Sequence, residues 1–119
     1  MREVSVVIPN YNGIEYIKTC LDALQRQTYG KVPIVLVDNG STDGSRELVE
    51  TSYPQVKVIV FPENTGFCHA VNVGILETNS PYVILLNNDT EVAPDFVEKL
   101  LSGIKKRKKA FSCAAKMIQ

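Results

Sequence analysis

Four short apolar runs, each followed by a polar cluster, constrain the fold of this chain more than any other feature. The runs cover residues 4–8, 34–37, 56–61 and 82–86. They are rich in β-branched residues, and continuous apolar runs of this length are typical of strands buried on both faces of a sheet. Segments with helical spacing separate them. Strands joined by helical crossovers predict an α/β fold, with an open, mostly parallel, Rossmann-like sheet and helices on both faces.

The segments between the runs have apolar residues at helical spacing. We predict a helix over residues 14–28, another after the loop of residues 38–44, and a third that follows Gly66 and ends at about residue 78. Pro94 suits the first turn of a helix, so a fourth helix is expected there. The apolar tail over residues 110–119 is predicted as a further strand.

Length and composition indicate one ordinary globular domain. The chain has 119 residues, of which 45% are apolar and 22% charged, and its formal net charge is zero. That balance gives no reason to expect nucleic-acid binding. No stretch approaches the roughly 20 apolar residues of a transmembrane helix, and no signal peptide precedes the first predicted strand. The expected location is the cytoplasm or the inner face of the membrane.

The cysteines and one basic run have simple interpretations. The three cysteines are widely spaced and lack Cys-x-x-Cys spacing, so reduced thiols are expected rather than a zinc site or a disulfide framework. The basic run at residues 105–109 is predicted to be a solvated helix end, with contact to anionic lipid or an acidic partner as the alternative.

Polar clusters follow all four predicted strands. They cover residues 9–12, 38–43, 62–66 and 87–89. Asn and Asp are also common turn residues, so each cluster alone is equally well explained as a turn. In a parallel sheet, however, the carboxyl ends of the strands meet at one edge, which is where ligands bind in open α/β folds. The convergence of four such clusters therefore favours a binding site.

The residue types in these clusters suit a nucleoside. Asp38 can accept hydrogen bonds from a base or a ribose. Tyr11 offers a flat face on which a base can stack. Asn64 and Asn72 supply paired donors and acceptors.

Two further features suit a diphosphate and a cation. Gly66 precedes a predicted helix, where free backbone amides can face an anion. Asp89 is a candidate ligand for a divalent cation, which usually completes its shell with phosphate oxygens and water. Base, ribose, diphosphate and cation together describe a nucleoside diphosphate.

Several other site types are missing from the sequence. There is no P-loop, no Gly-x-Gly-x-x-Gly fingerprint, and no credible Ser-His-Asp arrangement with a single histidine. We expect that histidine, His69, to be a packed or surface residue.

The ordered set of motifs resembles a known family. Its parts lie at residues 6–12, 37–45, 63–74 and 86–90, the third including Ala70, Asn72 and Gly74. The chain resembles the amino-terminal, nucleotide-sugar-binding half of family-two glycosyltransferases with the GT-A fold. The Asn-Thr-Gly-Phe and Asn-Asn-Asp-Thr forms are most similar to the rhamnosyltransferase-like subset.

The resemblance implies a nucleotide-sugar site and a divalent metal, Mg²⁺ or Mn²⁺. Pro9, Tyr11 and Asp38 would line the base and ribose site, and UDP or dTDP donors are favoured. Asp89 would bind the metal, more weakly than usual because Asn87 stands where the family has its first Asp. The expected nucleotide-sugar-binding residues are Pro9, Tyr11, Asn12, Asp38, Asn39, Asn64, Gly66, Asn72, Asn87 and Asn88.

The implied reaction is inverting transfer of the sugar to a hydroxyl of a saccharide or lipid-linked acceptor. Family members are usually much longer, with the general base and most of the acceptor site in the second half. Residues 1–119 are therefore expected to be a single domain truncated before that half, with no catalytic base of its own. An unpaired strand in the tail would favour a homodimer.

Two alternatives stay open at this stage. The chain can be a non-catalytic sugar-nucleotide-binding or assembly fragment. It can also be a nucleotidyltransferase, although such enzymes usually carry a Gly-rich first loop with a basic residue, and residues 11–15 do not supply one.

Overall fold

A single parallel sheet forms the centre of the structure, a computed structural model that describes residues 4–105. Its strands are β1 (Val4–Asn10), β2 (Ile34–Asn39), β3 (Lys57–Phe61) and β4 (Tyr82–Leu85). They lie in the order β3-β2-β1-β4, and every neighbouring pair is parallel. The four predicted strands and the predicted α/β class are confirmed, but burial on both faces is wrong for β3 and β4, which are edge strands and only partly buried. The predicted strand at residues 110–119 lies outside the described residues, as does Cys113.

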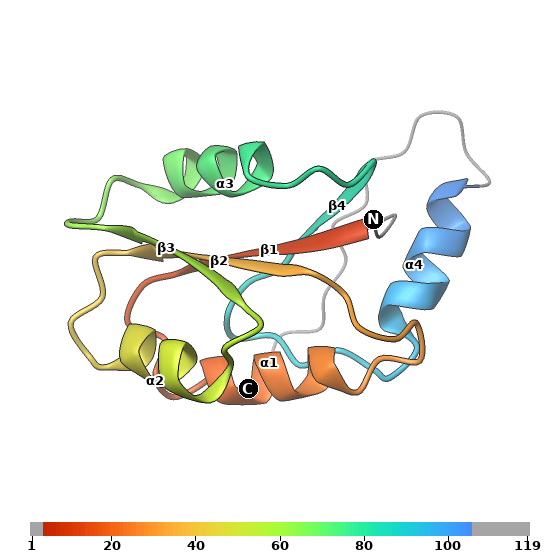
Figure 1. Ribbon diagram of the computed structural model, residues 1–119, viewed down its shortest axis with the longest axis horizontal. Coiled ribbons are helices and arrows are strands. Elements are labelled where there is room, and N and C mark those ends of the chain that lie inside the picture. Colours follow the sequence, from red (N-terminus) through yellow and green to blue (C-terminus); the bar gives the residue numbers. More distant parts are fainter. Residues whose placement is uncertain (1–3, 106–119) are drawn as a thin grey trace.

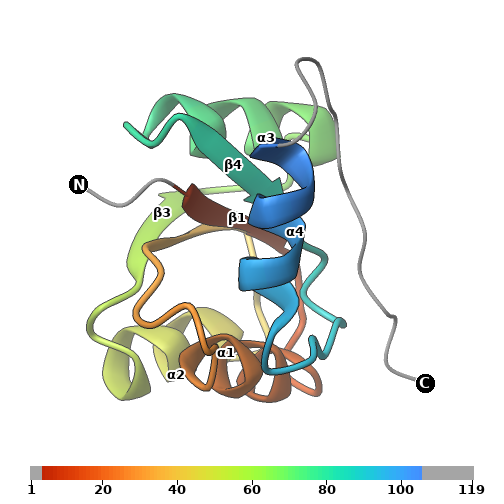
Figure 2. The ribbon, with the colours of Figure 1, turned by 90° about the vertical axis from the view of Figure 1, so that its right-hand side faces the viewer.

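Helices cover both faces of this sheet (Figure 1). They are α1 (Ile17–Gln25), α2 (Ser45–Ser52), α3 (Phe67–Leu76) and α4 (Phe96–Lys105). Helices α1 and α2 lie on one face and α3 on the other, while α4 stands at the end where β1 begins (Figures 1 and 2). No helix in the described range is long and apolar enough to cross a membrane.

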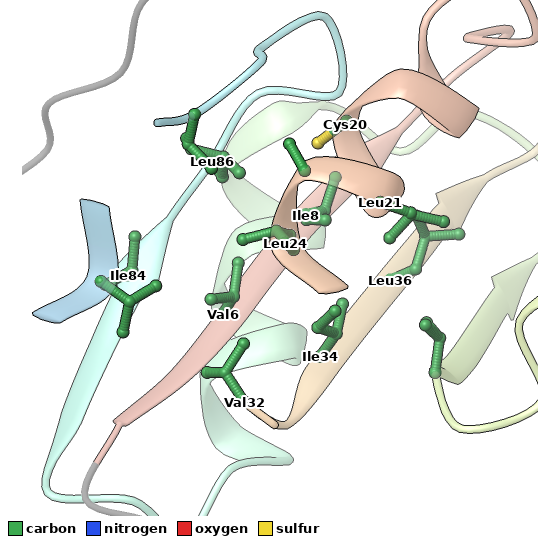
Figure 3. Packing of buried hydrophobic residues seen from close by; sticks show 14 of the residues in the cluster. Val6, Ile8, Cys20, Leu21, Leu24, Val32, Ile34, Leu36, Ile84 and Leu86 are labelled. Carbon is green, nitrogen blue, oxygen red and sulfur yellow. The ribbon is translucent and has the colours of Figure 1, made fainter. Parts of the chain in front are cut away.

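The larger core lies between the sheet and helices α1, α2 and α4. Alternate residues of β1 point to this side, and Val6 and Ile8 are fully buried there. Figure 3 shows Leu24 of α1 beside Val6 and Ile8, and Leu21 of α1 beside Leu36 of β2. Gln27, just beyond α1, binds the start of α4, because its Nε2 donates to Ala93 O at 2.8 Å and its Oε1 accepts from Val97 N at 2.9 Å.

The smaller core lies under α3. Val7 and Val37 are fully buried there and pack with Ala70. A Cβ at Gly74 would collide with the side chain of Val7 and come within 3.0 Å of Val37. Gly74 therefore allows α3 to approach the sheet closely.

The first helix is shorter than the sequence predicted. It begins at Ile17 rather than residue 14, and Ile14 is 39% exposed. Residues 12–14 are held by the loop after β2 instead, because Asn12 N donates to Ser41 Oγ at 2.9 Å and Ile14 N donates to Asp43 Oδ2 at 3.0 Å. Helix α4 likewise begins at Phe96, two residues after Pro94.

Candidate functional site

A cavity of about 270 Å³ opens at the carboxyl ends of the strands. The ends of β1, β2 and β3 lie at the left of Figure 1. The cavity is lined by Pro9, Asn10, Tyr11, Asn39, Asn64, Phe67, Asn87, Asn88 and Asp89. The structure thus brings together side chains from all four polar clusters. Of the residues expected at the site, Asn12, Asp38, Gly66 and Asn72 do not line this cavity.

A buried hydrogen-bonded chain supports the side of the cavity formed by β1 and β2. Asn10 is 1% exposed, and its Nδ2 donates to Asp38 Oδ1 at 2.9 Å and to Ser45 Oγ at 3.0 Å. Its Oδ1 accepts from Asn88 Nδ2 at 2.8 Å. The other carboxylate oxygen of Asp38 accepts from Ser41 N at 3.0 Å. Asp38, also 1% exposed, therefore lies behind the cavity and acts on it through Asn10.

The loops after β1 and β2 are joined to each other by Asn12 and Asp43. Asn12 has a left-handed backbone with φ of 52°, and its Oδ1 accepts from Thr42 N at 2.8 Å. Asp43 Oδ1 accepts from Ser45 Oγ at 2.6 Å. Burial alone would raise the pKa of Asp43, but hydrogen bonds from Ser45 and from Ile14 N outweigh it and hold that pKa below the usual value. Asn12 thus serves loop structure in this arrangement.

The loop after β3 is fixed by two asparagines that line the cavity. Asn39 Oδ1 accepts from Thr65 N at 2.8 Å, and its Nδ2 donates to Gly66 O at 3.1 Å. Asn64 Oδ1 accepts from Gly66 N at 2.9 Å. The Gly66 amide expected to face an anion is therefore already used within the loop.

Two residues of α3 lie away from the cavity lining. Asn72 is exposed on the helix. His69 stacks on Phe61 with ring centroids 5.0 Å apart, and its Nδ1 lies 2.8 Å from Thr65 Oγ1. The prediction of a packed or surface histidine agrees with this geometry.

The opposite side of the cavity, after β4, has unsatisfied polar atoms. Within the described part of the chain, the buried Oδ1 of Asp89 and Oγ1 of Thr90 have no hydrogen-bond partner. A buried carboxylate oxygen without a partner is unfavourable, so this position favours a ligand that supplies one. Beneath it lies Cys20, whose Sγ is 3.8 Å from Asn87 O. Burial raises the pKa of the Cys20 thiol to about 12, and the negative charge of Asp89 adds to the effect.

The donors around Asp89 limit how a cation can be held. Among residues 4–105, no three His, Cys, Asp or Glu side chains come together as a metal-binding group. Asp89 is the single carboxylate in the lining, beside the amides of Asn87 and Asn88. Such an all-oxygen set fits a hard cation that takes its remaining ligands from phosphate and water.

Sequence reasoning missed two lining residues, Asn10 and Phe67. Asn10 lies within the first polar cluster, and its position at the end of a buried strand was the available signal. Phe67 is 55% exposed, and Tyr11 is 50% exposed. Exposed aromatic rings at a cavity favour binding of a flat or apolar ligand face. The available signal for Phe67 was its place in the Asn-Thr-Gly-Phe motif, because apolar spacing alone does not distinguish it from a core residue.

Comparison with known proteins decides the family. The family model described as glycosyl transferase family 2 matches residues 5–118. The chain belongs to this family. Glycosyltransferase GlyA of Streptococcus pneumoniae is 34% identical over 104 residues, which cover 86% of this chain and 15% of GlyA.

Solved structures of the same fold agree with this assignment. TarS 1–349 of S. aureus, solved in complex with UDP, matches with a TM-score of 0.79 and 25% identity over 88% of this chain and 32% of that one. The mannosyltransferase PcManGT of Pyrobaculum calidifontis, solved with GDP-Man and Mn²⁺, matches with a TM-score of 0.65 and 28% identity over 74% of this chain and 28% of that one. The chain thus spans at most about a third of the length of these relatives.

Proposed function

We propose that this family-two glycosyltransferase chain binds a nucleoside-diphosphate sugar together with a divalent cation. The observation that carries the proposal is the buried, unpartnered Oδ1 of Asp89 beside a cavity of about 270 Å³ at the carboxyl ends of a parallel sheet. TarS with UDP and PcManGT with GDP-Man and Mn²⁺ support the ligand class.

The cavity has separate features for each part of this ligand. The exposed rings of Tyr11 and Phe67 suit stacking on the base or the sugar. The motif forms at residues 64–67 and 87–90 favour the rhamnosyltransferase-like subset. Membership of the family favours a UDP or dTDP donor. Asp38 contributes indirectly, by holding Asn10 in place.

We assign the cation to Asp89, beside the amide of Asn88 in the cavity lining. When bound, the cation supplies positive charge to the leaving diphosphate. The described residues themselves bind and orient the donor: Asp89 holds the cation, the asparagines offer polar contacts, and the aromatic rings offer flat surfaces. Low coordination by the protein makes cation binding depend on the diphosphate.

The proposed reaction is a direct displacement with inversion. An acceptor hydroxyl oxygen forms a bond to the anomeric carbon, while the bond from that carbon to the diphosphate oxygen breaks and its electron pair leaves with the nucleoside diphosphate. The hydroxyl proton passes to a general base that we place outside residues 4–105, with the acceptor site for a saccharide or lipid-linked acceptor. A single lining carboxylate also supports the alternative that these residues alone bind the donor without turnover.

The test is thermal unfolding with UDP or dTDP, each with Mn²⁺, Mg²⁺ or EDTA. A nucleotide at 100 times its Kd should raise the free energy of unfolding by about 2.7 kcal/mol, and EDTA should reduce that gain. Asp89→Asn should remove the metal-dependent part. The matched control is Glu91→Gln, an exposed carboxylate two residues away that does not line the cavity. Equal stabilisation of the wild type and Asp89→Asn would overturn the assigned site.

An acceptor assay separates the two functional alternatives. Release of nucleoside diphosphate that depends on an added saccharide or lipid-linked acceptor indicates transfer. Binding of the donor by this chain without such release would favour the binding fragment.

A further inference from the structure

We propose that Asn10 is a positioning residue that fixes which end of the Asn88 amide faces the cavity. Through it, the Asn88 carbonyl oxygen, rather than its NH₂ group, is presented beside Asp89. Only the identity of the ligand that contacts this oxygen rests on the proposed function. The orientation itself follows from the hydrogen-bonded chain.

The orientation of Asn10 is set by acceptors around its Nδ2, of which two are close and the third, Ser41 Oγ, lies at 3.3 Å. Asp38 is a carboxylate and can only accept, and it lies 2.9 Å from Asn10 Nδ2. Ser45 Oγ donates its proton to Asp43 Oδ1 at 2.6 Å, which leaves that oxygen as an acceptor for Asn10 Nδ2 at 3.0 Å. Two acceptors on one side require that Asn10 turn its NH₂ group toward them.

The orientation of Asn88 then follows from that of Asn10. With its NH₂ group committed, Asn10 can offer only its carbonyl oxygen to Asn88, and that oxygen accepts from Asn88 Nδ2 at 2.8 Å. The remaining polar atom of the Asn88 amide is its own carbonyl oxygen. Since Asn88 lines the cavity, this oxygen is the end available to a ligand.

Gly13 gives independent support for the contact between the two asparagines. A Cβ at Gly13 would collide with Asn88 Nδ2 and lie 2.5 Å from Asn10 Oδ1. Gly13 is not among the glycines with positive φ, so its backbone does not require glycine. The missing side chain leaves room for this hydrogen bond.

A fixed acceptor beside Asp89 selects for donor groups on the ligand. A ribose or sugar hydroxyl, or a water bound to the cation, can donate to the Asn88 oxygen, whereas an NH₂ group would repel a cation there. The hydrogen bonds from Asp38 through Asn10 therefore make Asn88 present an oxygen to the ligand. This oxygen partly offsets the scarcity of carboxylates in the cavity lining. Nucleotide affinity measured in EDTA tests donation from a hydroxyl to the Asn88 oxygen. Nucleotide affinity measured with Mn²⁺ tests donation from a water bound to the cation.

The first experiment reads the orientation in the ligand-free protein by NMR. We expect slow hydrogen exchange of the Asn10 and Asn88 side-chain NH₂ groups, with cross-relaxation between the Asn88 NH₂ group and the Gly13 Hα atoms. The exposed Asn79 NH₂ group is the internal control and should exchange fast. Fast exchange of the Asn88 NH₂ group would overturn the proposal, whether or not the protein binds nucleotide.

The second experiment is a double-mutant cycle on UDP affinity, measured by calorimetry with EDTA and with Mn²⁺. Introduced into the wild-type protein, Asn10→Ala should weaken UDP binding about tenfold. Introduced into the Asn88→Ala variant, it should weaken UDP binding little further. Equal losses in both backgrounds would mean that Asn10 acts otherwise than through Asn88. Asn79→Ala, at the opposite end of the sheet, should leave the affinity unchanged.

Asp38→Asn provides a variant of the same shape that tests polarity alone. Its amide can donate to Asn10, so both orientations of the chain become possible, and we expect faster exchange of the Asn88 NH₂ group and weaker UDP binding. Unchanged exchange in this variant would overturn the assigned cause. A wild type that binds no UDP would instead overturn the proposed function, while the NMR measurement still decides the orientation.

Discussion

The two sides of the cavity differ in how their polar atoms are satisfied. On the β1–β2 side, Asn10 and Asp38 are each 1% exposed and fully engaged in hydrogen bonds with one another and with neighbouring loops. On the β4 side, the buried Oδ1 of Asp89 has no partner within the described residues. One side satisfies its own polar atoms, whereas the other leaves a buried oxygen for which the proposed ligand would supply a partner. Preorganisation and binding capacity are thus assigned to different strands.

Asn10→Ala should have the largest effect on stability, because it removes the hydrogen bonds that satisfy the buried polar atoms on the β1–β2 side of the cavity. It leaves the Asp38 carboxylate buried with fewer donors, and we expect a loss of about 3 kcal/mol in the free energy of unfolding. Urea unfolding measures this loss. Asn79→Ala, an exposed asparagine, should change stability by less than about 0.5 kcal/mol. A loss of similar size in both variants would contradict the comparison.

Asn87→Asp should increase the affinity of the β4 side of the cavity for a divalent cation. A second carboxylate beside Asp89 should tighten Mn²⁺ binding in the presence of UDP about tenfold, equivalent to about 1.4 kcal/mol. Electron paramagnetic resonance of free Mn²⁺ measures this affinity. Asn79→Asp makes the same change in charge away from the cavity, and a matching gain there would show that only long-range charge is involved.

Asp89→Asn should stabilise the ligand-free protein while weakening binding. An amide at this position is cheaper to bury than a charged oxygen without a partner, so we expect a gain of about 1 kcal/mol in the free energy of unfolding without ligand. Thermal unfolding in EDTA measures it. Destabilisation of the ligand-free protein would mean that the carboxylate is satisfied after all.

Asp43→Asn should have the smallest effect, and it should depend on pH. The pKa of Asp43 is lowered in the folded state, so its carboxylate stabilises the fold above the usual Asp pKa of about 3.9, and that contribution is lost as the pH falls through the lowered value. We expect a loss of about 0.5 kcal/mol at pH 7, since the group is partly exposed. The wild type and the variant should converge near pH 2, and a constant difference would exclude this linkage.

The sequence predicted the fold well because its signals are local and redundant. The central strands β1 and β2 are the apolar runs that are almost wholly buried, and the registers of β1 with β2 and β4 and of β2 with β3 place all four polar clusters at one edge. Successive side chains of β2 point to opposite faces of the sheet, which explains why the adjacent residues Asp38 and Asn39 differ in their position relative to the cavity. Asp38 follows Leu36 of the larger core and turns behind the cavity, whereas Asn39 lies on the other side and lines it.

Two features were beyond the sequence because tertiary hydrogen bonds decide them. The apolar spacing predicted a helix from residue 14, but the contacts of Asn12 and Ile14 with the loop after β2 hold that segment out of the helix. The role of Asn10 likewise depends on partners 28, 35 and 78 residues away. Periodicity carries no information about such contacts.

The hydrogen bond between Asn10 and Asn88 also has a consequence for biosynthesis. It joins residues 78 positions apart in the sequence. Asn10 ends β1, which is the first strand to be synthesised. That strand pairs with β2 and with β4, the last of the four described strands. A ribosome must therefore release nearly ninety residues before the two walls of the cavity can meet. Such long-range closure is slow compared with helix formation. A nascent chain shorter than this has the first polar loops but lacks the β4 side of the cavity, so binding of the proposed ligand would report on completion of the sheet during synthesis.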